Sequence, residues 1–343
     1  MGPVLALAFT VALVVAATVF YTAWDLLGAR EVKTEHRIDS KTLFELVKLS
    51  FGVVAGAGAL VALVVAYRRQ RVDEDGALRD ATRLHTERFT TAVSQLGDDS
   101  AAVRLGGVHA LAGLADDAPT RELRQTCIDV LCAYLRLPYT PETDLPDDDA
   151  EARHVYLALR EVRHTVIRLI RDHLRLPPQH PRSWQGHDLD FTGVVFDGGD
   201  FTGITISSGT VDFSGATFSN GAVRFIRTKF SGGMVSFIGA KFPNGAVFFL
   251  EATFSGGKVS FNMAKFSGGM VFFTGAAFSG GEVDFDEAVF SGGEVSFTGA
   301  AFSGCRVNFS GATGSAPPGL VPDNGSPLPS GLALPGAWYP AGH

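Results

Sequence analysis

A twelve-residue repeat runs from Val211 to Phe309 and restricts the possible folds more than any other feature. Each unit contains a Val-x-Phe triad, and a second phenylalanine follows five residues after the first. The first phenylalanines of the units are Phe213, Phe225, Phe237, Phe249, Phe261, Phe273, Phe285, Phe297 and Phe309. The second are Phe218, Phe230, Phe242, Phe254, Phe266, Phe278, Phe290 and Phe302. Because one unit cannot bury its own phenylalanines, the units are predicted to stack and to share a continuous core.

The spacing within a unit predicts short sides of a coil. In Val-x-Phe, and in the Ala-x-Phe that contains the second phenylalanine, the outer residues point one way and the middle residue points the other. Glycine-rich elements such as Ser-Gly-Gly supply the corners, because glycine reaches positive φ at little cost. The 40 glycines and 27 phenylalanines of the chain fit a structure with many tight turns and a large aromatic interior. We expect the phenylalanine ladder to form that interior.

A five-residue spacing precedes the twelve-residue repeat. Phe191, Phe196, Phe201 and Ile206 are five apart in the run LDFTGVVFDGGDFTGITI. This run resembles the pentapeptide-repeat proteins, and the chain as a whole resembles their bacterial, membrane-anchored type. The resemblance implies a right-handed parallel β-helix with four five-residue sides, here over residues 187–313.

The length of one coil and the end of the ladder follow from the same pattern. Each unit of twelve holds two pentads and two extra residues, which we interpret as bulged corners, so that two units form one coil of 24 residues. A three-sided coil of twelve residues is the alternative. Gly314 stands where a successor to Phe302 is due, so we expect the ladder to end there. The Pro/Gly-rich residues 314–343 are predicted to form a disordered tail.

Two apolar segments lie near the N-terminus. Residues 1–24 contain no charged side chain, and residues 49–67 are uncharged up to the basic cluster at Arg68, Arg69 and Arg71. Each segment is long enough to cross a bilayer. Because the first basic residue is Arg30, a signal peptide is disfavoured. Residues 1–72 are therefore predicted to form two transmembrane helices with a connecting loop.

Basic residues give the orientation of these helices. The loop at 25–48 carries five Lys and Arg residues, and the stretch after the second segment carries six. The tight arginine cluster favours both termini in the cytoplasm, which makes this a multi-pass protein of the cell membrane with a cytoplasmic soluble part. Gly52 and Gly56 have the GxxxG spacing that lets a second helix approach, so a homo-oligomer is one interpretation.

Residues 73–180 predict a helical spacer. Apolar residues recur at helical spacing from Val103 to Leu114. The segments that begin at Arg124 and Arg163 align without a gap at an offset of 39 residues, which resembles HEAT or armadillo repeats. The three cysteines, Cys127, Cys132 and Cys305, match neither a disulfide framework nor a metal site and are expected to be buried thiols.

The third helix of the spacer, at 151–178, is strongly basic. A basic amphipathic helix could lie on an anionic membrane surface. We favour a solvated basic face whose opposite side packs in the spacer through Leu157, Val162, Ile167, Ile170 and Leu174. The following histidines lack metal-ligand spacing and are expected on the surface: His154, His164, His173, His180 and His187.

Function is expected on the outward positions of the coil. These positions contain no nucleophile beside a base, no metal constellation and no phosphate loop followed by a helix, so we predict neither an enzyme nor a cofactor. Phe248 and Phe272 are predicted to form an outward apolar spot for a protein partner or a second copy of the coil. A local acidic patch is predicted from Asp284, Asp286, Glu282, Glu287 and Glu294, of which Asp284, Asp286 and Glu287 are predicted interaction residues.

The resemblance also implies an alternative function. Some pentapeptide-repeat proteins imitate DNA and bind type II topoisomerases. Between residues 187 and 313 this chain carries eleven acids and seven Lys and Arg residues, a mixture unlike the sustained negative charge of a duplex. The net charge of −7 predicts no attraction to nucleic acid. The predicted function is a membrane-anchored, non-enzymatic scaffold whose partners are the lipid bilayer and an unknown protein, with a tethered topoisomerase regulator as the alternative.

Overall fold

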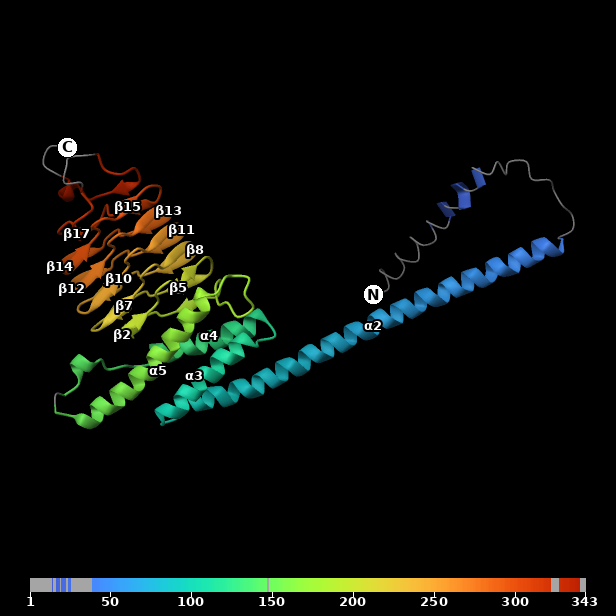
Figure 1. Cartoon of the computed structure of the whole chain (residues 1–343), viewed down its shortest axis with the longest axis horizontal. Coiled ribbons are helices and arrows are strands. Elements are labelled where there is room, and N and C mark those ends of the chain that lie inside the picture. Colours follow the sequence, from blue (N-terminus) through green and yellow to red (C-terminus); the bar gives the residue numbers. More distant parts are fainter. Residues whose placement is uncertain are drawn as a thin grey trace. The chain divides into compact units, whose positions relative to one another are not determined.

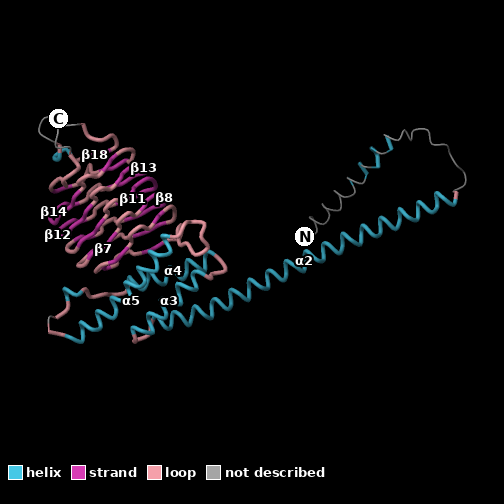
Figure 2. The backbone as a smooth tube through the Cα atoms, viewed as in Figure 1, coloured by secondary structure: helices cyan, strands magenta, loops and turns pink. Residues whose placement is uncertain are grey.

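The computed structural model describes residues 14, 17–18, 20–22, 24–25, 39–146, 148–321 and 327–339. The chain divides into two compact units, Met1–Asp75 and Gly76–His343, which are described separately. The colours of Figure 1 follow the sequence, and Figure 2 marks helices and strands.

The first unit contains the start of helix α2 (Ser40–Leu96), where the Asp39 carboxylate accepts a hydrogen bond of 2.8 Å from the Ser40 amide. This helix contains an uncharged, unburied window long enough and apolar enough to cross a membrane. It is the one such helix in the described part of the chain, and it includes the second predicted span. The first predicted span falls largely outside the described residues, although those described between 14 and 25 are helical. The structure therefore shows one candidate span.

The second unit begins with helices, as predicted for the spacer. After the end of α2 come α3 (Ala101–Asp116), α4 (Arg121–Arg136), the short η1 (Glu142–Asp144) and α5 (Ala150–Arg175). Side chains cap two of them, since Thr120 accepts from the Leu123 amide and Asp149 accepts from the Ala152 amide. Residues at helical spacing pack between them: Val108, Leu111, Ile128, Leu131, Val162, Val166 and Ile170. Leu157, predicted to pack with them, is instead 45% exposed.

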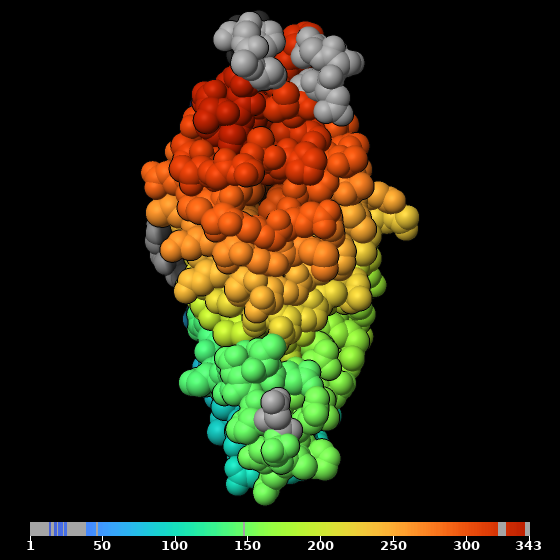
Figure 3. Space-filling view, turned by 90° about the vertical axis from the view of Figure 1, so that its left-hand side faces the viewer, coloured from blue at the N-terminus to red at the C-terminus, as the bar shows by residue number. Residues whose placement is uncertain are grey.

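The rest of the second unit is a parallel β-solenoid of two nine-stranded sheets. One sheet contains β1 (Leu189–Asp190), β4 (Thr205–Ile206), β5 (Thr210–Asp212), β8 (Lys229–Ser236), β11 (Thr253–Ser260), β13 (Ala277–Asp284), β15 (Ala301–Phe302), β16 (Arg306–Asn308) and β18 (Leu332–Ala333). The other contains β2 (Val195–Phe196), β3 (Gly199–Asp200), β6 (Thr217–Phe218), β7 (Ala222–Arg224), β9 (Lys241–Phe242), β10 (Ala246–Phe248), β12 (Lys265–Phe272), β14 (Val289–Ser296) and β17 (Thr313–Gly314). In Figure 3 the coils follow one another in chain order from yellow to red.

Strand register gives the length of a coil. Val211 pairs with Val235, Val235 with Val259, and Val259 with Val283, so two sequence units form one coil of 24 residues. The alternative coil of twelve residues is wrong. The first coil is two residues shorter, because Leu189 pairs with Val211.

Phenylalanine rings fill the interior of the coils. All nine predicted ladder residues are at most 1% exposed. Rings one coil apart stack with centroids 4.5 to 4.9 Å apart, as in Phe237 on Phe261 at 4.6 Å and Phe249 on Phe273 at 4.7 Å. The stack that contains Phe261 meets the stack that contains Phe273 edge to face at 5.8 Å. Both arrangements suit aromatic quadrupoles and bury a large apolar area.

Glycine is required at the Ser-Gly-Gly corners because backbones of successive coils approach closely there. Gly257 has a φ of +69°, and a Cβ on it would lie 2.5 Å from the carbonyl oxygen of Gly233 in the preceding coil. A Cβ on Gly281 would meet Gly257 at the same distance. The glycine column therefore sets the spacing of the coils as well as the shape of the corner.

The segment after residue 313 caps the solenoid, so the predicted disordered tail is wrong for its described part. Strand β18 pairs with β16, and η2 (Gly336–Trp338) follows it. The Trp338 ring lies 5.5 Å from that of Phe290 and 5.8 Å from that of Phe309, and its Nε1 donates to the Gly314 carbonyl at 2.8 Å. Gly314 follows Phe290 in register and has no side chain to cover it. The Trp338 ring covers Phe290 and Phe309 instead and keeps the last phenylalanines of the core away from water.

The helical spacer covers the other end of the solenoid. Gly199 occupies the register position that Val223 and Val247 hold in later coils. Ile167 of α5 lies 3.4 Å from the point where a Cβ on Gly199 would stand, so this side chain takes the missing place in the valine column. Trp184, in the loop before β1, is fully buried.

Arginines of the spacer bind the first coil, contrary to the prediction of a solvated basic face. Arg163 is 3% exposed and donates to the carbonyls of Leu135 and Val195, both at 2.7 Å. Arg175 donates to the Thr202 carbonyl at 2.6 Å. The buried guanidinium group of Arg163 is stable here because carbonyl oxygens of α4 and of the first coil accept its hydrogens.

The predicted surface placement of the histidines is wrong for His187, which is 5% exposed. Its Nδ1 lies 3.0 Å from the Gln125 Oε1, at the junction of α4 and the first coil. His173 is also largely buried, whereas His154 and His180 are exposed. Sequence spacing does not reveal this burial because the partners come from another part of the chain.

Burial and the nearby Arg121 and Arg124 lower the pKa of His187 from 6.5 to about 4. The free energy of unfolding is therefore expected to fall as the pH drops from 6.5 to about 4. The unfolded chain then binds a proton at His187 that the folded chain does not, so acid favours unfolding. The loss is expected to be about 3 to 3.5 kcal/mol, at about 1.4 kcal/mol per pKa unit. Denaturant unfolding at several pH values measures it. The matched variant His187→Asn keeps a donor for Gln125 without titrating, and an identical pH profile in the two proteins would contradict the assignment.

Candidate interaction surface

Phe248 and Phe272 lie together on the outer side of the solenoid. They are directly paired in register on β10 and β12, and their ring centroids are 5.9 Å apart at an interplanar angle of 19°. Both side chains are half-buried. In the same register Arg224 precedes them and Ser296 follows them, so the apolar spot is two coils wide.

Met270 extends this apolar spot, although the sequence analysis did not single it out. It stands two residues before Phe272 on β12, which places it on the same side of the strand. Its exposed fraction is 44%. Because Met270 and Phe272 are two residues apart, the sequence alone could have predicted that both side chains point outward. Phe248, Phe272 and Met270 are called the aromatic spot below.

The three predicted acidic residues are mostly engaged in local turns. Asp284 accepts from the Asp286 amide at 3.0 Å and from the Asn308 side chain at 3.1 Å. Asp286 accepts from the Gly311 amide at 2.7 Å. Glu287 is exposed. The carboxylates of Asp284 and Asp286 hold corners of neighbouring coils together, as aspartates commonly do in turns.

The aromatic spot and the acidic residues do not form one surface. The two phenylalanines belong to the sheet that contains β10 and β12, whereas Asp284 ends β13 of the other sheet. The structure therefore divides the predicted interaction residues into two separate groups.

Opposite charges alternate beside the acidic residues. Lys258, Glu282 and Arg306 share one register position on three successive coils. The Lys258 Nζ lies 2.9 Å from one Glu282 carboxylate oxygen, and Arg306 lies 3.4 Å from the other. The hydrogen bond from Lys258 lowers the pKa of Glu282. The negative charge of this row is thus locally neutralised.

Asp197 is the centre of a buried polar cluster that the sequence analysis missed. Its side chain is 3% exposed and accepts hydrogen bonds from the hydroxyls of Tyr139 and Tyr156, the latter at 2.8 Å. His164 and Arg160 of α5 each lie 3.4 Å from its carboxylate. Burial alone would raise the pKa of Asp197, but the hydrogen bonds from His164 and the two tyrosines outweigh it and lower the pKa to about 2. The cluster joins the spacer to the first coil by a carboxylate that is charged at neutral pH.

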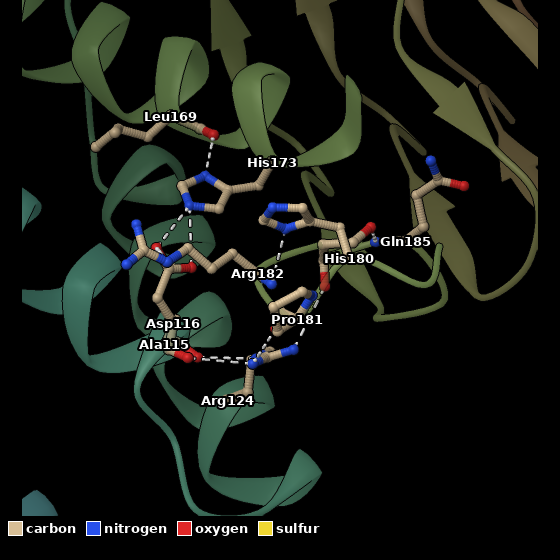
Figure 4. Close-up of polar contacts among 10 residues, drawn as sticks. Ala115, Asp116, Arg124, Leu169, His173, His180, Pro181, Arg182 and Gln185 are labelled. Atoms are coloured by element: carbon tan, nitrogen blue, oxygen red, sulfur yellow. Dashed lines mark hydrogen bonds and ion pairs between the residues drawn. The ribbon is translucent and has the colours of Figure 1, made fainter. Parts of the chain in front are cut away.

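A second missed cluster lies within the spacer, and Figure 4 shows it. The Nδ1 of His173 lies 2.6 Å from the Leu169 carbonyl, its Nε2 lies 3.0 Å from the Asp116 carboxylate, and its ring stacks on Trp184 at 4.1 Å. Arg124 donates to the carbonyls of Ala115 and Pro181 in the same view. Because both ring nitrogens of His173 face acceptors, neither is available to act on a substrate, and the cluster is a clamp between α3, α4 and the loop after α5.

The cysteines lie where the sequence predicts them, as buried thiols. Burial raises the pKa of Cys127 and of Cys305 to about 11, so both stay protonated and unreactive at neutral pH. Within the described ranges, no three His, Cys, Asp or Glu side chains gather as metal ligands.

Comparisons of the chain with protein-family models, with curated proteins and with solved structures found no match. The parallel β-solenoid with phenylalanines at regular spacing therefore rests on this chain's own sequence and structure.

Proposed function

We propose that the protein is a membrane-anchored, non-enzymatic scaffold of the pentapeptide-repeat type, and that its solenoid presents the aromatic spot to a protein partner. The observation that carries the proposal is the stacked pair Phe248 and Phe272 at outward positions that hold Arg224 and Ser296 in the adjoining coils. Half-exposed aromatic rings beside a flexible methionine are typical of protein contact sites. A stacked aromatic core makes the supporting coils rigid, so little ordering entropy opposes binding.

Crosslinking in cells tests the aromatic spot in the full-length chain. A photoreactive amino acid at Met270 is expected to give a discrete crosslinked product, and the variant Phe248→Ser/Phe272→Ser is expected to remove it. Serine is the matched choice because Ser296 occupies the next place in this register. A photoreactive group at the exposed Lys241 is the control position. The mass of the product distinguishes a second copy from another protein, and a product that survives the double substitution would refute the assignment.

Membrane anchoring is the second part of the proposal. It is supported by the exposed apolar side chains of α2, such as Phe51 at 71% and Leu63 at 69%, followed by Arg68, Arg69 and Arg71. With two spans, both termini lie in the cytoplasm. A C-terminal reporter that is active on only one side of the membrane is expected to give the cytoplasmic signal. An external signal would contradict the proposed orientation and place the soluble part outside the cell.

Regulation of a type II topoisomerase is the weaker proposal. A DNA mimic needs a continuous negative surface, whereas Lys258 and Arg306 flank Glu282 in register. A supercoiling assay with the full-length protein tests it, and inhibition would favour mimicry.

A further inference from the structure

A basic cleft lies between α5 and the first two coils of the solenoid. Its volume is about 330 Å³. One wall is a single face of α5, because its basic residues are four, four and three residues apart: Arg160, His164, Arg168 and Arg171. Strands β3 and β7 form the other wall, together with Gly198, which precedes β3. The residues of this wall are Gly198, Gly199, Asp200, Ala222 and Arg224. The lining carries four arginines against one carboxylate.

Two of these arginines are not used to hold the fold. Arg171 binds Asp200, and Arg160 lies beside Asp197. Arg168, by contrast, is 48% exposed, donates to Thr165 on its own helix, and lies 3.9 Å from Glu161. The side chain of Arg224 is exposed and makes no hydrogen bond or ion pair with any residue that the structure describes, and only its backbone is bonded, in strand β7.

A buried donor also remains unsatisfied beside the cleft. The Nε of Arg160 is buried and makes no hydrogen bond with a described residue, although it lies 3.4 Å from the Asp197 carboxylate. An unsatisfied buried donor is costly unless another acceptor binds nearby. The arginine side chain that carries this donor lines the cleft.

Gly198 keeps the cleft open. A Cβ on Gly198 would lie 3.3 Å from the Cε1 of His164, so a larger side chain would fill the space between coil and helix. The next coil carries Ala222 and Val223 where the first carries Gly198 and Gly199, which places the opening at the end of the solenoid that the helical spacer covers.

We infer that this cleft binds a phosphate group, of either a soluble phosphate ester or a lipid headgroup. A planar guanidinium group pairs with two phosphate oxygens through two parallel hydrogen bonds. Several guanidinium groups around one cleft can therefore balance the charge of a phosphate. A phosphate monoester carries close to two negative charges at neutral pH. Asp197 and Asp200 already pair with Arg160 and Arg171, so Arg168 and Arg224 are the two guanidinium groups of the lining that remain for a phosphate. Arg224 of the cleft adjoins Phe248 in register, but the cleft shares no residue with the aromatic spot and does not depend on the proposed scaffold function.

Titration of the full-length protein with inorganic phosphate, in nanodiscs of phosphatidylcholine at constant ionic strength, tests the inference by calorimetry. Saturable binding is expected, and Arg168→Gln/Arg224→Gln is expected to weaken it at least about tenfold, because charge-assisted hydrogen bonds are lost. The matched control Lys241→Gln/Lys265→Gln removes the same charge from exposed strand positions outside the cleft and is expected to bind as the unmodified chain does. Unchanged thermal unfolding of both variants shows that the fold is retained.

Nanodiscs that also contain phosphatidic acid distinguish the two sources of phosphate. If the lipid headgroup occupies the cleft, the apparent affinity for inorganic phosphate falls in these discs, and if the ligand is soluble it does not change. Both outcomes support a phosphate site. The inference is overturned if the unmodified chain shows no saturable binding, if the arginine variant binds equally well, or if the lysine control loses as much affinity as the arginine variant.

Discussion

Phe261→Ala is expected to lower the free energy of unfolding by about 3 to 5 kcal/mol. The Phe261 ring is fully buried and stacks on Phe237 and Phe285 with centroids 4.6 Å away on either side. Phe249 and Phe273 meet its edges at 5.8 Å. The rings above and below are each fixed to the backbone of their own coil, so they cannot move in to fill the cavity. Denaturant unfolding of the full-length protein, followed by circular dichroism of the sheet, measures the loss.

Phe302→Ala is the control at the end of a stack. Phe302 is only half-buried and stacks on one ring, that of Phe278, at 4.8 Å. The same truncation should therefore cost clearly less, roughly 1 to 2 kcal/mol, because less contact is lost and water reaches the site. Equal losses at the two positions would mean that the stack does not act as a continuous core.

The twelve-residue repeat predicts the solenoid because every coil makes the same contacts. Identical residues one coil apart occupy equivalent positions, so the inward triads and the glycine corners can be assigned from spacing alone. The coil of 24 residues follows from counting pentads, and strand register confirms it. The shorter first coil deviates because its pentads carry fewer extra residues.

The two ends of the solenoid were less predictable, since each is closed by residues that do not repeat. Pro/Gly-rich composition suggested disorder after residue 313, yet Trp338 stands 24 residues after Gly314 and restores an aromatic ring at the end of the column. That spacing was a usable signal. At the other end no spacing shows that arginines of α5 bind carbonyls of the first coil, because a helix with one basic face has the same pattern when that face is solvated.

Asp197→Ala is expected to destabilise the protein by about 3 to 5 kcal/mol, because it leaves buried polar groups without their partner. The hydroxyls of Tyr139 and Tyr156 lose their acceptor, and Arg160 and His164 lose the carboxylate 3.4 Å away. The lost contacts join the spacer to the first coil. Thermal unfolding of the full-length protein at neutral pH measures the effect.

Asp197→Asn separates the charge of this group from its hydrogen bonds. The amide keeps an oxygen for one tyrosine hydroxyl but cannot balance Arg160, so its effect should lie between those of the unmodified chain and Asp197→Ala. The sign with pH is fixed by the pKa of Asp197, which is lowered from 3.8 to about 2. Its stabilisation is therefore fully present above pH 3.8 and lost as the pH falls through about 2. Between neutral pH and pH 4 the stability difference between Asp197→Asn and the unmodified chain should stay constant, whereas a difference that shrinks in that range would mean that Asp197 is protonated in the folded protein.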